Sequence, residues 1–90
     1  MRAVVTVAGK DHVGVIAKIA TTLFEHNVNI LDVHQNILGG DMFAMTMLVE
    51  LEGCDISFPA LTTELEADGV ELNMKVHVMH EDIFNAMHRI

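Results

Sequence analysis

The chain has 90 residues, of which 51% are hydrophobic and 20% charged, so it suits one folded domain and is too apolar for a disordered segment. Thirteen acidic residues against five Lys and Arg residues give a net charge of −8, and the five cations are spread singly along the sequence. Because nucleic acids and anionic membranes attract clustered cations, neither is expected as a partner.

The cysteine content and the spacing of charges indicate the cellular setting. Cys54 is the only cysteine, which excludes an internal disulfide and a multi-cysteine zinc site. The longest stretches without Asp, Glu, Lys or Arg have about eight residues, whereas a membrane-spanning helix needs ~20. No export signal is recognisable in the first residues, so we expect a cytoplasmic protein.

The first third of the chain predicts a strand followed by a helix. Residues 3–8 are rich in β-branched types and stop at Gly9, which is typical of a strand. From Val13 to about His26, apolar residues recur at the spacing of an amphipathic helix. This stripe consists of Val13, Ile16, Ala17, Ala20, Leu23 and Phe24. We expect Asp11 to cap the start of the helix and Asn27 to end it in the left-handed conformation.

The middle of the chain predicts a hairpin. Residues 28–38 and 42–51 read as two antiparallel strands, and Gly39-Gly40 followed by Asp41 is typical of the turn between them. A hairpin centred on the two glycines gives one face to Asp32, His34, Asn36, Phe43, Met45 and Met47. The other face then holds Leu31, Val33, Ile37, Met42, Ala44 and Leu48. Both faces carry apolar residues, so Phe43, Met45 and Met47 are expected to need a C-terminal helix, a partner subunit or both as cover.

The second half predicts a helix, a strand and a short terminal helix. The helix is expected to end at Asp68-Gly69, and its stripe consists of Phe58, Leu61 and Leu65. Its acidic residues are expected to form a solvated face; they are Glu64, Glu66 and Asp68. Residues 71–79 alternate as a strand, and residues 81–90 carry apolar side chains at helical spacing. The last set comprises Ile83, Phe84, Met87 and Ile90.

The order strand, helix, strand, strand, helix, strand is typical of an α+β, ferredoxin-like βαββαβ fold. Right-handed crossovers place the four antiparallel strands in the order 4-1-3-2, with two helices on one face. The short C-terminal helix is expected to pack on this domain or on its dimer partner. The apolar residues on both faces of the hairpin favour a homodimer.

The loop from Gly9 to Gly14 is the sharpest candidate site. It follows a strand and opens a helix, so free backbone N–H groups and the positive end of the helix dipole favour a carboxylate there. The glycine spacing is also that of a phosphate-binding loop, but Val15-Ile16 replace the Lys-Ser/Thr pair that nucleotides require. The structural alternative is that Gly14 only allows close helix packing and Asp11 only caps the helix.

The segments Val-Ala-Gly9-Lys-Asp11-His-Val-Gly14 and Asn27-Val-Asn29-Ile resemble those of ACT domains, which bind amino acids or other small effectors, usually at a dimer interface. The resemblance covers residues 1–80 and is greatest to stand-alone ACT proteins and to the modules of glycine-cleavage regulators. It implies that Asp11 and Asn29 hold the polar groups of the effector, and an acidic Asp11 favours a zwitterion. The ligand-binding residues implied are Gly9, Lys10, Asp11, His12, Val13, Gly14, Asn29 and Ile30.

Metal binding and catalysis are less well supported. The six histidines are His12, His26, His34, His77, His80 and His88. His77 and His80 should face opposite sides of a strand, and His34 and His77 should lie at opposite sheet edges about 14 Å apart, so no metal site is expected unless two subunits combine their histidines. His26 is expected near the end of the first helix, where a cationic ring meets the dipole. No histidine is predicted beside Cys54, so neither an enzyme nor a cofactor is expected.

We therefore expect a small homodimeric sensor that holds an amino acid or a similar carboxylate and transmits its occupancy to a separate regulated protein. The alternative is a protein–protein interaction module that acts on an enzyme without a small ligand.

Overall fold

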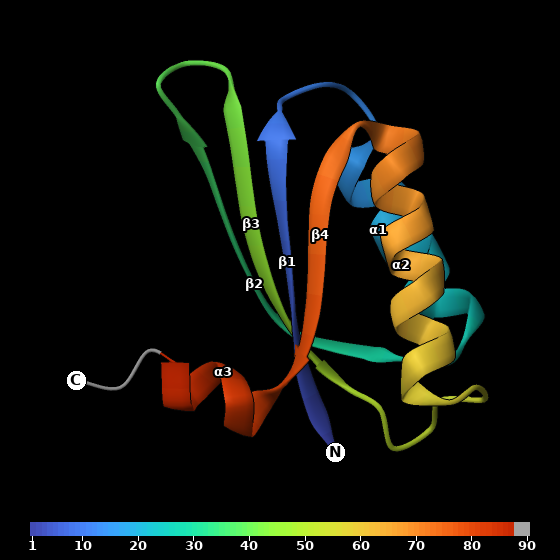
Figure 1. Cartoon of the computed structure of the whole chain (residues 1–90). Coiled ribbons are helices and arrows are strands. Elements are labelled where there is room, and N and C mark those ends of the chain that lie inside the picture. The colour runs from blue at the N-terminus through green and yellow to red at the C-terminus, as the bar shows by residue number, and fades with distance from the viewer. Residues whose placement is uncertain (88–90) are drawn as a thin grey trace.

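The computed structural model describes residues 1–87, which form four strands and three helices (Figure 1). In chain order these are β1 (Arg2–Lys10), α1 (Val15–Glu25), β2 (Asn29–Leu38), β3 (Met42–Glu50), α2 (Phe58–Leu72), β4 (Met74–His80) and α3 (Glu81–Met87). The antiparallel sheet has the order β2-β3-β1-β4, which confirms the predicted ferredoxin-like topology. Helices α1 and α2 cover one face, here called the helix face. The opposite face, called the open face, carries α3 at one end only (Figure 1).

Helix α1 begins two residues later than predicted, because Gly14 rather than Asp11 occupies its N-cap. Gly14 has a φ of 96°, in the left-handed region that glycine adopts without steric cost. Asp11 instead donates its backbone N–H to the Asp41 carbonyl, 2.7 Å away. Asn27 has a φ of 59°, which confirms the predicted left-handed residue at the other end.

The late start changes which side of α1 is buried. Its core residues are Val15, Ile19, Thr22 and Leu23. Of the predicted stripe only Leu23 is buried, whereas Val13, Ile16 and Phe24 are exposed. The predicted stripe was therefore wrong by a fraction of a turn, and Val13, Ile16 and Phe24 are apolar side chains left exposed.

The turn between β2 and β3 has three residues, and this number reverses the predicted faces of the hairpin. Ile37 lies opposite Phe43, and Leu38 lies opposite Met42. Because side chains alternate along a strand, the one-residue shift moves every side chain of β2 to the other face relative to β3. Met45 and Met47 accordingly point into the helix face with Phe43, and the three are at most 2% exposed. The expectation that they need another cover was wrong.

A bulge near the start of β2 compensates for the extra turn residue. Ile30 lies opposite Val49 while Asp32 lies opposite Leu48, so Leu31 is the additional residue. A bulge bends its strand, and β2 turns sharply at this point in Figure 1. The bulge returns Ile30 to the hydrophobic core, where it is partly buried.

Helix α2 is longer than predicted. It begins after Ser57, whose hydroxyl accepts the N–H of Ala60 at 3.2 Å, and it passes through Gly69 to Leu72. Asn73, with a φ of 57°, ends it. The predicted end at Asp68-Gly69 was therefore wrong, as was a strand starting at residue 71.

Gly69 allows α2 to approach β4, and Asp68 joins α2 to α1. A Cβ atom on Gly69 would lie 2.7 Å from Val76 Cγ2 and 2.9 Å from the Met74 carbonyl oxygen. Asp68 is 8% exposed and accepts a hydrogen bond from the Thr22 hydroxyl, so it does not belong to a solvated acidic face. Both residues hold the helices against each other and against the sheet.

Helix α3 is described as far as Met87, so the predicted helical residues 88–90, including Ile90, lie outside the described part of the chain. Within residues 1–87, no helix combines the length and the apolar character needed to cross a membrane.

The close approach at Gly69 predicts that Gly69→Ala destabilises the protein, although alanine favours a helix by about 1 kcal/mol over glycine. The overlap with Val76 and with the Met74 carbonyl should lower the free energy of unfolding by about 1–3 kcal/mol. Urea denaturation measures this change. Val70→Ala is the control on the same helix, and because Val70 is 83% exposed its effect should stay within about 0.5 kcal/mol. A more stable Gly69→Ala protein would show that the helix is free to move away.

Candidate functional site

The loop between β1 and α1 is held to the end of α2 by His12. The His12 Nε2 atom lies 2.6 Å from the Leu72 carbonyl oxygen, and Nδ1 lies 3.1 Å from the Val13 carbonyl oxygen. The Leu72 carbonyl, and after it the Val13 carbonyl, raises the pKa of His12 above its usual 6.5 because both oxygens favour a protonated ring. The contact with Leu72 therefore fixes the loop to the end of α2.

A shallow pocket of about 200 Å³ lies beside this loop. The loop and the first turn of α1 form one side, and Gln35 of β2 and Phe43 of β3 form the other. The first helical hydrogen bond runs from the Lys18 N–H to the Gly14 carbonyl, so the N–H groups of residues 15–17 have no acceptor within the helix. Such N–H groups, together with the positive end of the helix dipole, favour a carboxylate. The side chain of Asp11 adds a negative charge at the same pocket.

Of the predicted site residues, Asp11, His12 and Gly14 line this pocket together. Gly9 and Lys10 belong to the end of β1 and do not line the pocket, and Val13 is exposed. Asn29 and Ile30 lie at the far end of the sheet. Asn29 lies opposite Glu50, whereas Lys10 at the loop lies opposite Met42. Eight residues of β3 separate these positions, a distance of about 26 Å at the rise of a strand. Asn29 is exposed and Ile30 is partly buried. One copy of the chain therefore cannot use Asn29 and the loop on the same small ligand.

His26 and Cys54 have structural roles. His26 lies at the end of α1 as predicted, with Nδ1 2.8 Å from Asp55 Oδ1 and Nε2 2.9 Å from Glu64 Oε2. Asp55, followed by Glu64, raises the pKa of His26. Cys54 packs against the core at its edge. Within residues 1–87, no three His, Cys, Asp or Glu residues are placed to share a metal ion, and His88 lies outside this range.

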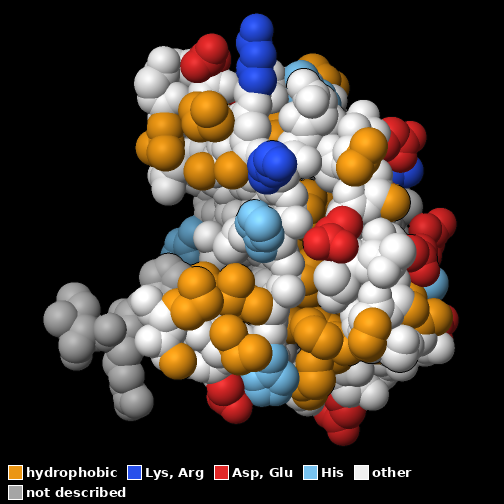
Figure 2. Space-filling model, in the orientation of Figure 1, with side chains coloured by type: hydrophobic (Ala, Val, Ile, Leu, Met, Phe, Trp, Pro, Cys, Tyr) orange, Lys and Arg blue, Asp and Glu red, His pale blue; other side chains and the backbone are white. Residues whose placement is uncertain are grey.

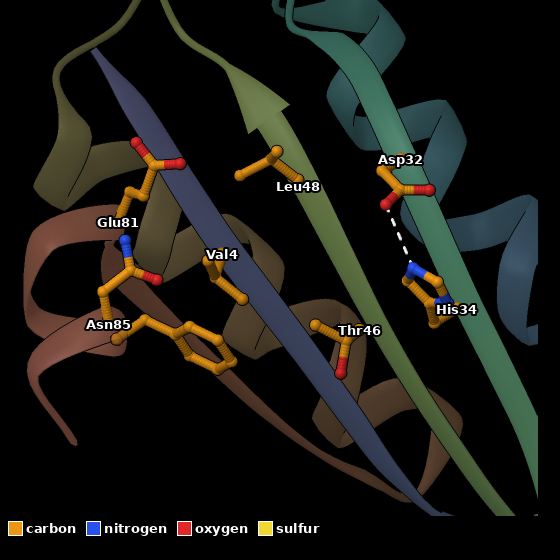
Figure 3. Close-up of a pocket in the computed structure, with 8 residues that line it drawn as sticks. Val4, Asp32, His34, Thr46, Leu48, Glu81 and Asn85 are labelled. Atoms are coloured by element: carbon orange, nitrogen blue, oxygen red, sulfur yellow. Dashed lines mark hydrogen bonds and ion pairs between the residues drawn. The ribbon is translucent and has the colours of Figure 1, made fainter. Parts of the chain in front are cut away.

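A second pocket, which sequence reasoning missed, lies on the open face beneath α3. It has a volume of about 190 Å³, with Val4, Thr46 and Leu48 on its floor. Figure 3 shows Asp32 and His34 of β2 on one side, their side chains 3.0 Å apart, and α3 on the other. The register of the hairpin and the position of α3 create this pocket, and neither can be read from periodicity alone.

Comparisons with known proteins agree on one family. A family model for the ACT domain matches residues 2–79. A UPF0237 protein of Methanopyrus kandleri is 51% identical over 89 residues, which cover 99% of this chain and 98% of the relative. The structure of an ACT domain protein from Streptococcus pneumoniae superposes with a TM-score of 0.81 at 34% identity, over 93% of each chain.

A glycine cleavage system transcriptional repressor shares the fold. It superposes with a TM-score of 0.73 at 19% identity, and the match covers 89% of this chain and 47% of the repressor. At this identity the likeness concerns the fold alone.

The contacts of His12 predict a pH-dependent stability of the loop. A pKa raised in the folded state means that the protonated ring stabilises the fold fully below pH 6.5, and that this contribution disappears as the pH rises through the folded pKa. The stability difference between the parent and His12→Ala should therefore be largest in mild acid and shrink at alkaline pH. Urea denaturation from pH 5.5 to 8.5 measures it, and NMR of the ring gives the pKa directly. A ring that titrates at or below 6.5 would contradict the prediction. His26→Ala is the comparison. The pKa of His26 is also raised, so its contribution to stability should fall with rising pH in the same way, although His26 does not contact the loop.

Proposed function

Because the chain belongs to the ACT domain family, whose members are regulatory modules that bind small molecules, we propose that it is a homodimeric sensor for an amino acid or a similar small carboxylate. The pocket at the β1–α1 loop carries this proposal. Its free N–H groups suit the carboxylate of a ligand, and Asp11 suits an ammonium group. A zwitterion satisfies both, and the sensor then acts on a separate regulated protein.

The edge formed by β2 supports a dimer. Strand β2 has a neighbour on one side only, and Val33 and Ile37 are exposed on its helix face. On α1, Lys18 pairs with Glu71 of α2, so the side of α1 away from α2 faces toward β2 and presents Ile16. An apolar strip beside an unpaired strand is a surface that a second copy can cover.

Antiparallel pairing of β2 with β2 of a second copy is self-complementary. If the two-fold axis passes through Gln35, Val33 of each copy lies opposite Ile37 of the other. The start of β2 in one copy then lies near the hairpin turn of the other. Asp41 of that turn is bonded to Asp11, so the pairing carries Asn29 of the second copy toward the loop. We propose that the effector binds there, between the loop of one subunit and Asn29 of the other.

This arrangement predicts that two defective variants restore binding when mixed. A thermal-shift screen of the proteinogenic amino acids first identifies a ligand, since specific binding raises the melting temperature. Asn29→Ala should weaken its affinity by about 10- to 150-fold, because it removes a hydrogen bond to a charged group. Asp11→Ala should do the same. A heterodimer of the two variants contains one intact site, so calorimetry on the heterodimer, separated from the two homodimers, should find parental affinity at half the stoichiometry.

A site contained in one chain would leave both sites of this heterodimer defective. Asp11→Ala is a better loop variant than one at Gly14, where the φ of 96° strains any other residue. If no amino acid or simple carboxylate binds, the protein–protein interaction module replaces the sensor as the proposal.

The β2 interface predicts a change of mass when charges are placed on it. The parent should scatter light as a particle of twice the 9.9 kDa chain mass. The double variant Val33→Lys, Ile37→Lys should be monomeric, because it sets four like charges against each other across the two-fold axis. Val70→Lys, on the exposed side of α2, is the matched control and should stay dimeric. A parent of single-chain mass, or a double variant that remains dimeric, would refute this interface.

A further inference from the structure

The open face carries a row of four polar side chains that crosses the whole sheet. The register places His34 opposite Thr46, Thr46 opposite Thr6, and Thr6 opposite His77. Neighbours in such a row are about 4.8 Å apart, and side chains opposite each other lie on the same face. Two hydroxyls therefore stand between two imidazoles, away from α1 and α2.

The next row toward the hairpin has small side chains at its centre. Its members are Asn36, Ala44, Ala8 and Lys75, so two alanines occupy the centre. On the other side of the polar row, α3 covers Val4 and Leu48. The surface is accordingly hollowed between the hairpin and α3, and Figure 2 shows histidine side chains beside the hollow.

In the described part of the chain, the open face carries two lysines that have no ion pair. Among residues 1–87, the two lysines without an ion pair are Lys10 and Lys75, and both lie on the open face. Of the two carboxylates that line the pocket beneath α3, Glu81 pairs with Arg2. Asp32, hydrogen-bonded to His34, lies on β2 at the sheet edge opposite to that of Lys75. A protein of net charge −8 thus keeps unpaired positive charge beside the hollow.

A pocket with an apolar floor adjoins the polar row. The 190 Å³ space beneath α3 has Val4 and Leu48 as its floor (Figure 3). Phe84 of α3 also lines it. Successive residues on one face of a strand are about 7 Å apart, so this pocket and the row of Lys75 are two such steps apart. A small molecule with an apolar group at one end and an anionic group at the other can reach from the pocket to the polar row.

We propose that the open face binds a small organic anion, with its apolar group in the pocket under α3 and its carboxylate or phosphate on the polar row. Lys75 and His77 supply N–H donors, and the Thr6 and Thr46 hydroxyls donate from below. This site lies on the opposite side of the sheet from the β1–α1 loop, so it does not depend on the sensor site proposed above.

The test uses two probes of this chemistry, 3-phenylpropionate and phenyl phosphate, titrated into the ¹⁵N-labelled protein. We expect amide shifts at Thr6, Thr46 and His77, with the loop at residues 10–14 unaffected. The uncharged 3-phenylpropionamide should bind at least about tenfold more weakly, because it lacks the charge-assisted bonds. Which acid binds more tightly decides between a carboxylate and a phosphate.

Lys75→Met should weaken the preferred probe by about tenfold or more, and Lys75→Arg should retain most of the affinity. Lys18→Met changes the net charge by the same amount on the helix face, so it controls for non-specific attraction. The proposal is overturned if neither acid binds at about 10 mM, the range expected for fragments of this size. Equal effects of Lys75→Met and Lys18→Met also overturn it. A third outcome would also overturn it: the Lys75→Met protein binds the probe as the parent does but has a different mass in light scattering. The open face would then be a contact between copies of the chain.

Discussion

The length of the turn between β2 and β3 is the constraint on which both faces of the sheet depend. Three residues rather than two place Val33 and Ile37 of β2 on the same face as Phe43, Met45 and Met47, which belong to the core. The same register sends His34 and Thr46 to the open face. A sheet edge tolerates such a shift only if the far end of the strand can be realigned, and the bulge at Leu31 does this. Core and surface are thus set together by one turn and one bulge.

The order of elements follows from the sequence because hydrophobic residues recur every 2 residues in strands and every 3.6 residues in helices. The strand topology follows because crossover connections between strands are right-handed. The errors occur where the outcome depends on a single residue. Gly14 shifts the start of α1 through its positive φ, and one additional turn residue inverts the hairpin. Gly69 was predicted to end α2 because glycine is common just after the last residue of a helix. Here it lies within α2, and its missing side chain lets the helix pack against β4.

The two pockets differ in how far sequence reasoning reaches them. The β1–α1 loop is visible because a strand, a glycine and a helix follow each other directly in the chain. The sequence does not show how far this loop lies from Asn29. That distance depends on the strand pairing, which puts the loop beside the end of β2 and leaves Asn29 at its start. The pocket beneath α3 requires three strands in register and a helix packed across them. Its residues therefore come from four separate parts of the chain, and only residues of the same strand or helix are near each other in the sequence.

The bulge at Leu31 also bears on aggregation. An exposed edge strand is a template on which further chains can add without limit, and long straight edges carry the greatest risk. Here the bend confines the regular part of the edge to residues 32–38, and the strand curves beneath the helices before that point. A short segment that pairs with itself about a two-fold axis consumes both edges in one closed contact, whereas a longer straight strand could slip and grow into a filament. In the dimer proposed above, the irregularity in β2 therefore limits association through this edge to one closed contact.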